Sequence, residues 1–330
     1  MRSTLDQAPP EPRAAGAVEW LDSLLRCPGL HHEVTIDRAA AQVTCTLEHC
    51  PLAGRVFPII DGQPILVDFP NSVLDEATTV DREAPILVTR SSGWQHSLSL
   101  LVFGDKPMAR RNAARFLELV KAGAPSPVVL VVGGGTIGDG AEALYHEPGI
   151  RLIAFDIYRS EQTHFVADAH SIPLAEGSID GVWIQAVLEH VLSPEKVVAE
   201  IYRVLRPGGL VYAETPFMQQ VHEGPYDFTR FTQGGHRWLF RRFELIDSGV
   251  ERGPFTVLLW SIRYALGGLI RSRRIATLIC TLLFWVRYFD HLVPEPHASD
   301  GASDLYFMGR RAETVLSPAE VIQAYAGAQH

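Results

Sequence analysis

A glycine-rich segment stands between an apolar run and two well-spaced acidic residues. Gly133-Gly134-Gly135-Thr136-Ile137-Gly138 directly follows the apolar residues 128–132. Glycine lets the backbone approach a ligand closely, because it has no Cβ that would clash. Asp156 ends the next apolar run, where its carboxylate can accept hydrogen bonds from both hydroxyls of a ribose. Asp168 follows twelve residues later and suits the exocyclic amine of adenine. Together these features predict a site for an adenosine-containing cofactor.

Histidines and acidic residues gather in a later segment that suits proton transfer. The segment runs His222-Glu223-Gly224-Pro225-Tyr226-Asp227-Phe228-Thr229-Arg230-Phe231. Loops so rich in ionisable and aromatic groups are more often functional than structural. We expect His222 to act as a general base, with Tyr226, Asp227 and Arg230 shaping the substrate pocket.

Each of these assignments has a plainer alternative. The segment 222–231 could instead be a capping loop, in which Tyr226 and Phe231 fill the core and Asp227 pairs with Arg230. His190, in Glu189-His190, is a second catalytic candidate whose alternative is to begin a helix and pack locally.

The surrounding segments alternate between strand and helix patterns. Apolar strand runs separated by helical patterns predict a parallel sheet covered by helices on both faces. Pro207-Gly208-Gly209 ends one predicted helix before the next strand. The predicted strands are 128–132, 151–155, 181–184 and 210–214, and the predicted helices are 109–121, one that begins at 138–145, and 194–205.

In order and spacing these pieces resemble the class I S-adenosylmethionine-dependent methyltransferase family over roughly residues 106–250. The matching pieces are 131–138, Asp156, 167–169, 179–182 leading to 187–191, and 205–209. The resemblance implies an α/β fold with a Rossmann-like seven-stranded sheet, a final antiparallel strand, and S-adenosylmethionine over the carboxyl ends of the strands. The residues that we expect to bind this cofactor are Gly133, Gly135, Thr136, Gly138, Asp156, Ile157, Asp168, Ala169 and Gln185.

The same resemblance implies methyl transfer to a small molecule. Segments similar to 222–231 occur in a bacterial branch of the family, many of whose members act on sugars, lipids or secondary metabolites. We expect transfer to an oxygen or nitrogen atom. Many family members carry an acidic residue in the strand before the glycines, whereas Val131 and Val132 stand here. The anchor of the amino-acid end of the cofactor is therefore open, with Trp94 and His96 as candidates.

Two other functions fit parts of the pattern. A nicotinamide-dependent oxidoreductase has the same glycine spacing. It has no use for Asp168, however, and would place a pyrophosphate at a helix N-terminus where Asp139 would repel it. A catalytically idle S-adenosylmethionine-binding scaffold that partners another protein is the second alternative, and the ionisable loop argues against it.

The first eighty residues contain three of the four cysteines. Segments 24–28 and 50–66 resemble the small zinc-ribbon-like domain that partners tRNA, ribosome and release-factor methyltransferases. That family has Cys-x-x-Cys at both knuckles, which suits tetrahedral zinc, but Leu30 and Ala53 occupy the second positions here. We therefore expect a metal-free module that is kept for its apolar fold and its contact with the catalytic domain. A metal would need replacement ligands, and the candidates are His31, His32, Cys45 and His49.

The last part of the chain holds two apolar helical stretches, 255–270 and 275–289. The uncharged run Ile275–Val286 is shorter than the ~20 residues that a membrane span requires, and an arginine cluster precedes it. We expect a helical pair packed on the catalytic domain. A lid over an apolar substrate, a homodimer interface and shallow membrane contact are the alternatives.

Composition limits the remaining function classes. The chain has 330 residues and a net charge of -9, which argues against nucleic acid as a partner. Four cysteines do not make a disulfide scaffold, and residues 1–13 lack the apolar run of a signal peptide, so a cytoplasmic location is expected. We predict a cysteine module at 1–80, a methyltransferase domain at 81–252 and a helical extension that completes it at 253–330.

Overall fold

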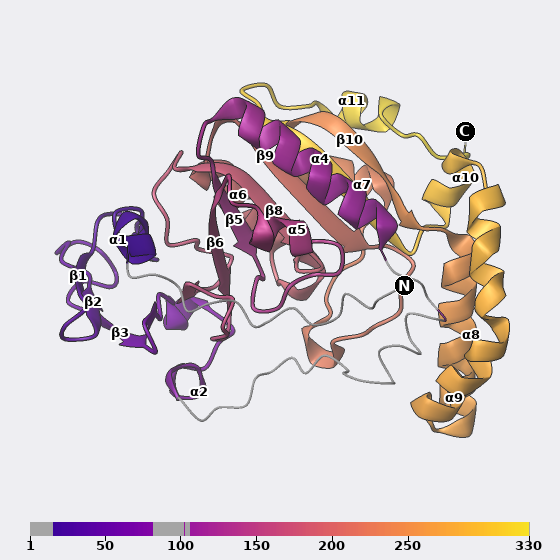
Figure 1. Cartoon of the computed structure of the whole chain (residues 1–330), viewed down its shortest axis with the longest axis horizontal. Coiled ribbons are helices and arrows are strands. Elements are labelled where there is room, and N and C mark those ends of the chain that lie inside the picture. The colour runs from indigo at the N-terminus through magenta and orange to yellow at the C-terminus, as the bar shows by residue number, and fades with distance from the viewer. Residues whose placement is uncertain (1–15, 82–101, 103–105, 330) are drawn as a thin grey trace.

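A seven-stranded sheet forms the centre of the molecule (Figure 1). The computed structural model describes residues 16–81, 102 and 106–329. Strand order in the sheet is β10-β11-β9-β8-β5-β6-β7, and only β11 runs antiparallel to its neighbours. The predicted Rossmann-like sheet with an antiparallel strand is confirmed. Its strands are β5 (Val128–Val132), β6 (Arg151–Asp156), β7 (Phe165–Val166), β8 (Ile179–Gln185), β9 (Leu205–Pro216), β10 (Phe243–Arg252) and β11 (Asp304–Arg311).

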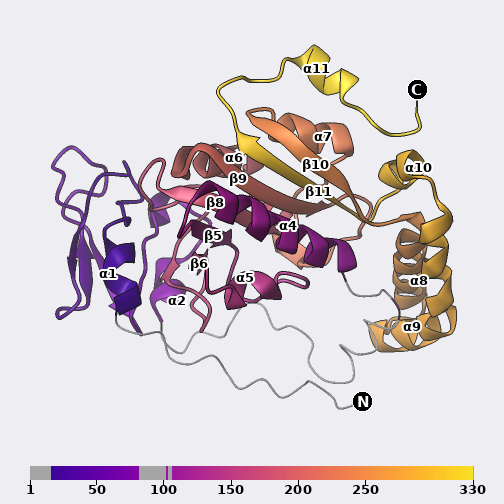
Figure 2. The same ribbon diagram turned by 45° about the horizontal axis from the view of Figure 1, so that its top comes forward.

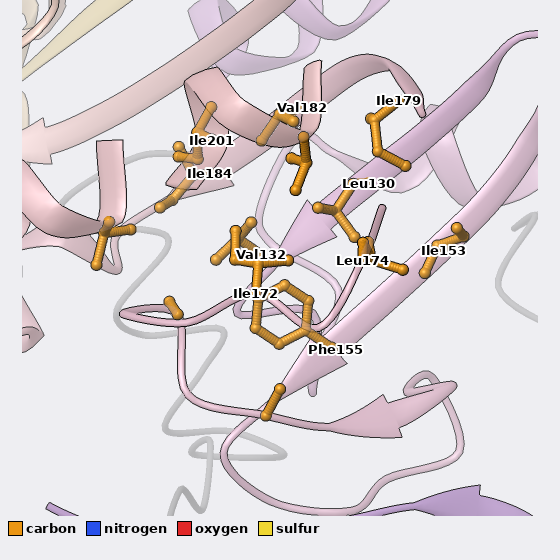
Figure 3. Close-up of a cluster of buried hydrophobic side chains, with 14 of the residues drawn as sticks. Leu130, Val132, Ile153, Phe155, Ile172, Leu174, Ile179, Val182, Ile184 and Ile201 are labelled. Atoms are coloured by element: carbon orange, nitrogen blue, oxygen red, sulfur yellow. The ribbon is translucent and has the colours of Figure 1, made fainter. Parts of the chain in front are cut away.

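Helices cover both faces of this sheet (Figure 2). Successive side chains of a strand point to opposite faces. In β5, Val129 and Val131 therefore pack with Phe116 of α4 (Pro107–Gly123), while Leu130 and Val132 pack with Ile201 of α6 (Pro194–Val204) (Figure 3). Each fully buried aliphatic side chain of this kind contributes ~1.5–3 kcal/mol to folding. Two short helices complete the layers, α5 (Glu142–His146) on the α4 face and α7 (Gln233–Leu239) on the α6 face.

The strand order reverses at β5, because β6 lies on one side of it and β8 on the other. Ligands of open α/β sheets bind at the carboxyl ends of the strands at such a switch point. The glycine segment leaves β5 at this place. It does not begin a helix at residue 138, so that part of the prediction was wrong: α5 has only five residues, Glu142–His146. Gly138 and Gly140 disfavour helix and keep the segment a loop.

The N-terminal module has its own sheet, in the order β1-β2-β3-β4. The predicted turn at Asp61-Gly62 is confirmed: φ is 52° and 79° at these residues, as in a two-residue hairpin turn. Ile65 pairs in parallel with Val166, so the module extends the β7 edge of the main sheet. The module contains α1 (Gly16–Asp22), β1 (Thr35–Asp37), β2 (Gln42–Thr44), β3 (Val56–Ile60), β4 (Gln63–Pro64), η1 (Phe69–Asn71) and α2 (Glu76–Val80).

A helical hairpin lies at the opposite end of the molecule (Figure 1). In it α8 (Pro254–Ile270) packs against α9 (Arg273–Cys280) and its continuation η4 (Thr281–Leu292), which confirms a helical pair. The continuous helix Arg273–Leu292 has 20 residues and contains an 18-residue stretch with mean hydropathy 1.3, of which 11% is buried. By length and composition it is long enough to cross a membrane. It contains the predicted helical stretch 275–289 and extends beyond it at both ends. The chain then forms α10 (Glu295–Asp300), β11 and α11 (Pro318–Gln323).

Candidate active site

The glycine loop is closely packed against the ends of the neighbouring strands. Gly133 has φ of +74°, and a Cβ there would lie 2.3 Å from Cγ2 of Val187. A Cβ on Gly135 would lie 2.5 Å from the ring of Tyr158. The positive φ and the close contact therefore favour glycine at position 133, whereas a Cβ at position 135 would require the ring of Tyr158 to move. Thr136 and Gly138 follow half-buried on the same loop.

Asp156 stands at the end of β6 and joins the glycine loop. Its Oδ2 accepts a hydrogen bond from the backbone N–H of Gly135 at 2.8 Å, and its Oδ1 accepts one from that of Ile157 at 2.7 Å. Each carboxylate oxygen has two lone pairs, so each can accept one more donor. Burial raises the pKa of Asp156 to about 6. Two ribose hydroxyls would supply the missing donors and favour the ionised form.

Asp168 is held from both sides of its carboxylate. Its Oδ1 accepts two hydrogen bonds from His170, one from the backbone N–H at 2.9 Å and one from the ring Nδ1 at 2.6 Å. The other ring nitrogen of His170, Nε2, accepts a hydrogen bond from the backbone N–H of Ser193. Oδ2 accepts a hydrogen bond from the hydroxyl of Ser72, at 2.5 Å. Burial opposes ionisation, but these hydrogen bonds outweigh it and lower the pKa of Asp168. Oδ2 keeps a lone pair for an amine, and Ala169 is buried beside it.

An ion pair that was not predicted lies at the ends of β8 and β9. Nζ of Lys106, before α4, pairs with Oε1 of Glu214, which is 2% exposed. Nε2 of Gln185 donates to Oε2 of Glu214 at 3.0 Å and to the carbonyl of Asp139 in the glycine loop at 3.1 Å. Burial, reinforced by the charge of Glu214, raises the pKa of the neighbouring Glu251 to about 8. The arrangement offers an ammonium and a carboxylate beside the glycine loop.

Lys106 and Glu214 carry the kinds of charge that would bind the amino-acid end of a cofactor. The candidates for that role in the sequence, Trp94 and His96, lie outside the described residues. Glu214 ends a predicted strand, which was a signal that the sequence contained. Lys106 gave none, because it lies 108 residues from its partner.

A second cluster stands where β8 ends, next to the glycine loop. Glu189 and His190 belong to η2 (Leu188–His190), directly after the Val187 that contacts Gly133. The carboxyl group of Glu189 is fully buried and has no hydrogen-bond partner among the described residues. Its Oε1 lies 3.6 Å from Nε2 of His190 and 3.8 Å from Nε2 of His222. Burial raises the pKa of Glu189 to about 8, so it is largely protonated at neutral pH.

The loop that carries His222 is fixed to this cluster through Asp227. Nδ1 of His222 lies 3.3 Å from Oδ2 of Asp227, which also accepts a hydrogen bond from the backbone N–H of His222 at 2.9 Å. Arg230 contacts both oxygens of Asp227. Burial opposes the charge of Asp227, but Arg230 and the His222 backbone outweigh it and hold its pKa well below the usual range. A charged Asp227 therefore orients His222 so that Nε2 faces Glu189.

His190 is oriented in a similar way. Its Nδ1 donates a hydrogen bond to the carbonyl of Tyr226 at 2.7 Å, and its ring packs edge-on against that of His222, with centroids 4.9 Å apart. Burial lowers the pKa of His190, so the ring is neutral and Nε2 carries the lone pair. The side chain of Tyr226 is 51% exposed and does not fill the core, whereas Phe231 is buried.

A hollow of about 510 Å³ opens between this loop and the helical hairpin. Asp227 and Arg230 line it, whereas Tyr226 and His222 are not among its lining residues. The substrate roles of these residues stay predictions. Tyr264 of α8 forms a wall, and its hydroxyl donates to the carbonyl of Val221. The lining residues are Gln219, Gln220, Val221, Asp227, Phe228, Thr229, Arg230 and Tyr264.

Residues 132–213 match the family model described as a methyltransferase domain. They comprise the glycine loop, both acidic residues of the cofactor site and the Glu189-His190 turn. Over these residues the chain has a methyltransferase domain. The loop glycines and the spare acceptor positions of Asp156 would suit S-adenosylmethionine, the cofactor that the sequence predicts.

The methyltransferase domain is similar to several curated proteins. It is 28% identical over 169 residues to a malonyl-[acyl-carrier protein] O-methyltransferase of Enterobacter lignolyticus, covering 49% of this chain and 64% of that protein. It is 35% identical over 152 residues to a demethylmenaquinone methyltransferase of Clavibacter sepedonicus, covering 42% and 60%. The chain thus spans less than two thirds of the length of these relatives. A solved SAM-dependent methyltransferase of Archaeoglobus fulgidus is 14% identical with a TM-score of 0.42, covering 66% of this chain and all of that one.

Proposed function

We propose that this chain transfers a methyl group from S-adenosylmethionine to an oxygen or nitrogen atom of a small molecule, with His222 as the general base. The observation that carries the proposal is the position of His222 between the charged Asp227 and the buried Glu189. Glu189 follows the Val187 that contacts Gly133 of the glycine loop. The cofactor supplies an electrophilic methyl group when bound. The protein then has to position the acceptor in line and remove its proton.

The cofactor would be held by three sets of side chains. Asp156 accepts hydrogen bonds from the ribose hydroxyls, and Asp168 with Ala169 receives the adenine. Gln185 and the Lys106–Glu214 pair would bind the amino-acid end, Lys106 at its carboxylate and Glu214 at its ammonium group; the contacts among these three side chains support this role. Burial works against the charge of Lys106, but Glu214 and Asp304 outweigh it and raise the pKa of Lys106, which keeps the ammonium charged.

At the reacting centre, Nε2 of His222 would accept the proton of the acceptor hydroxyl or amine. The methyl carbon would exchange its bond to the sulfonium sulfur for a bond to the acceptor atom, leaving a neutral thioether on the cofactor. Asp227 stabilises the resulting imidazolium through Nδ1, and Arg230 keeps Asp227 ionised. The cavity that Arg230 and Tyr264 line receives the rest of the acceptor. The names of the two relatives describe an O-methyltransferase and a demethylmenaquinone methyltransferase, which supports an acceptor other than nucleic acid.

Isothermal titration of the purified chain with S-adenosylmethionine and with NAD tests the cofactor step. We expect saturable binding of S-adenosylmethionine and none of NAD. Binding of NAD alone would overturn the proposal. Screening of hydroxyl- and amine-bearing sugars, lipids and quinones with methyl-labelled cofactor then tests the transfer itself. Tight cofactor binding with no transfer to any of these acceptors would favour the scaffold alternative.

A further inference from the structure

Four side chains that can ligate a metal meet inside the N-terminal module. They are Cys27, His32, Cys45 and Cys50, and their ligating atoms all lie within 4.8 Å of one another. Sγ of Cys27 lies 3.7 Å from Sγ of Cys50, and Sγ of Cys45 lies 3.3 Å from Nε2 of His32. The sulfur atoms are too far apart for a disulfide, whose bond is about 2.05 Å long. All three cysteines are buried, and His32 is half-buried.

These separations are those of a tetrahedral zinc site. Zinc binds thiolate sulfur at about 2.3 Å and imidazole nitrogen at about 2.0–2.1 Å. Around a tetrahedral ion, such bonds separate two sulfurs by about 3.8 Å and a sulfur and a nitrogen by about 3.6 Å. The observed separations of 3.7 Å and 3.3 Å are close to both values.

The backbone around the sulfurs also fits metal-bound thiolates. The sulfur of Cys50 accepts a hydrogen bond from the backbone N–H of Leu52 at 3.4 Å. Such a contact orients a ligand and stabilises negative charge on it.

We propose that this chain binds one structural zinc ion through Cys27, His32, Cys45 and Cys50. This reverses the expectation of a metal-free module, which rested on the two lost knuckle positions, Leu30 and Ala53. The proposed ligands differ from those of the zinc-ribbon pattern. His32 and Cys45 take the place of the two missing cysteines but stand at other positions in the sequence. Four protein ligands leave no open position, so the ion stabilises the fold and does no chemistry.

The zinc ion would fix the part of the module that supports the cofactor site. Its ligand Cys27 follows Arg26, whose backbone N–H donates to the carbonyl of Pro173 at 2.9 Å, just beyond Asp168. Next to its ligand His32, His31 contacts Ser171 at 3.1 Å. Residues 26–32 thus join the metal cluster to the loop that follows the adenine-binding acid. This inference does not depend on methyl transfer.

Metal analysis of the untagged full chain, purified under reducing conditions, tests the inference directly. We expect about one zinc ion per chain, and an X-ray absorption spectrum with about three sulfurs near 2.3 Å and one nitrogen near 2.0–2.1 Å. Less than about a tenth of a zinc ion per chain, both as purified and after dialysis against zinc, would overturn it.

Neighbouring residues provide matched controls. Cys45→Ser and His32→Gln should lose the zinc, whereas Cys280→Ser, at a buried thiol outside the module, and His31→Gln should keep it. Because the first two variants can fail to fold, the metal content of the wild type is measured first. Zinc that stays with Cys45→Ser and disappears with His222→Ala would place the ion in the Glu189 cluster and overturn the ligand assignment.

Discussion

The hydroxyl of Ser72, in the N-terminal module, donates a hydrogen bond to the carboxylate of Asp168 in the methyltransferase domain at 2.5 Å. The two residues are 96 positions apart in the sequence. The module therefore reaches directly to the acid that we expect to bind adenine.

We predict that Ser72→Ala weakens S-adenosylmethionine binding by up to ~10-fold, because hydrogen bonds to a charged group are worth ~1.5–3 kcal/mol and part of that orients Asp168. Titration calorimetry measures the change. Thr79→Ala is the matched control, since the Thr79 hydroxyl bonds only within its own helix, to the carbonyl of Asp75. Equal affinities of Ser72→Ala and the wild type would show that the module does not support the cofactor site.

Asp156→Asn should weaken cofactor binding more, by ~10- to 100-fold, because the amide replaces a carboxylate acceptor by a neutral one. The wild type should also lose affinity as the pH falls through about 6, where burial places the pKa of Asp156. The asparagine variant should not show this dependence. A pH series of dissociation constants tests both points, and the same pH dependence in the two proteins would assign it to another group.

Glu189→Gln should change how stability depends on pH. The pKa of Glu189 is about 8 in the folded protein and 4.5 ordinarily, so between these values the folded state binds more protons than the unfolded state. Stability of the wild type therefore falls as pH rises through this window, by up to ~1.4 kcal/mol per pH unit from this residue. The variant lacks that loss, so its stability relative to the wild type should increase with pH.

Urea denaturation of both proteins at several pH values between about 5 and about 8 measures the difference. Glu251, whose pKa is also about 8, contributes equally to both proteins and cancels. A difference in stability that stays constant over this range would mean that Glu189 is ionised in the folded protein.

The sheet could be predicted from the sequence because local patterns determine it. Val128–Val132 alternates between two buried faces, so the run is apolar throughout and marks a central strand. The pairing of Asp227 with His222 and Arg230 was also predictable, since these residues lie within one short loop.

Contacts set by the tertiary fold could not be predicted. Lys106 meets Glu214, and Glu189 meets His222, only because of strand order and loop packing. The predicted stretch 275–289 ends just before Asp290, whereas the helix continues to Leu292. In the structure Asp290 accepts hydrogen bonds from the backbone N–H groups of Phe255 and Thr256 at the start of α8, where a helix favours negative charge.

His222→Ala tests the proposed base most directly. We expect kcat to fall by ~10²–10⁴, while cofactor affinity stays unchanged, because the residue removes a proton from the acceptor and does not bind the cofactor. His190→Ala should cost much less, since His190 only packs against His222 and holds the carbonyl of Tyr226. An exposed histidine, His146, gives the surface control. The ligating atoms of Glu189, His190 and His222 also lie within 4.8 Å of one another. If both histidine variants lost the same amount of activity, and only the wild type held a second metal ion per chain, this cluster would be a metal site. His222 would then not be the base.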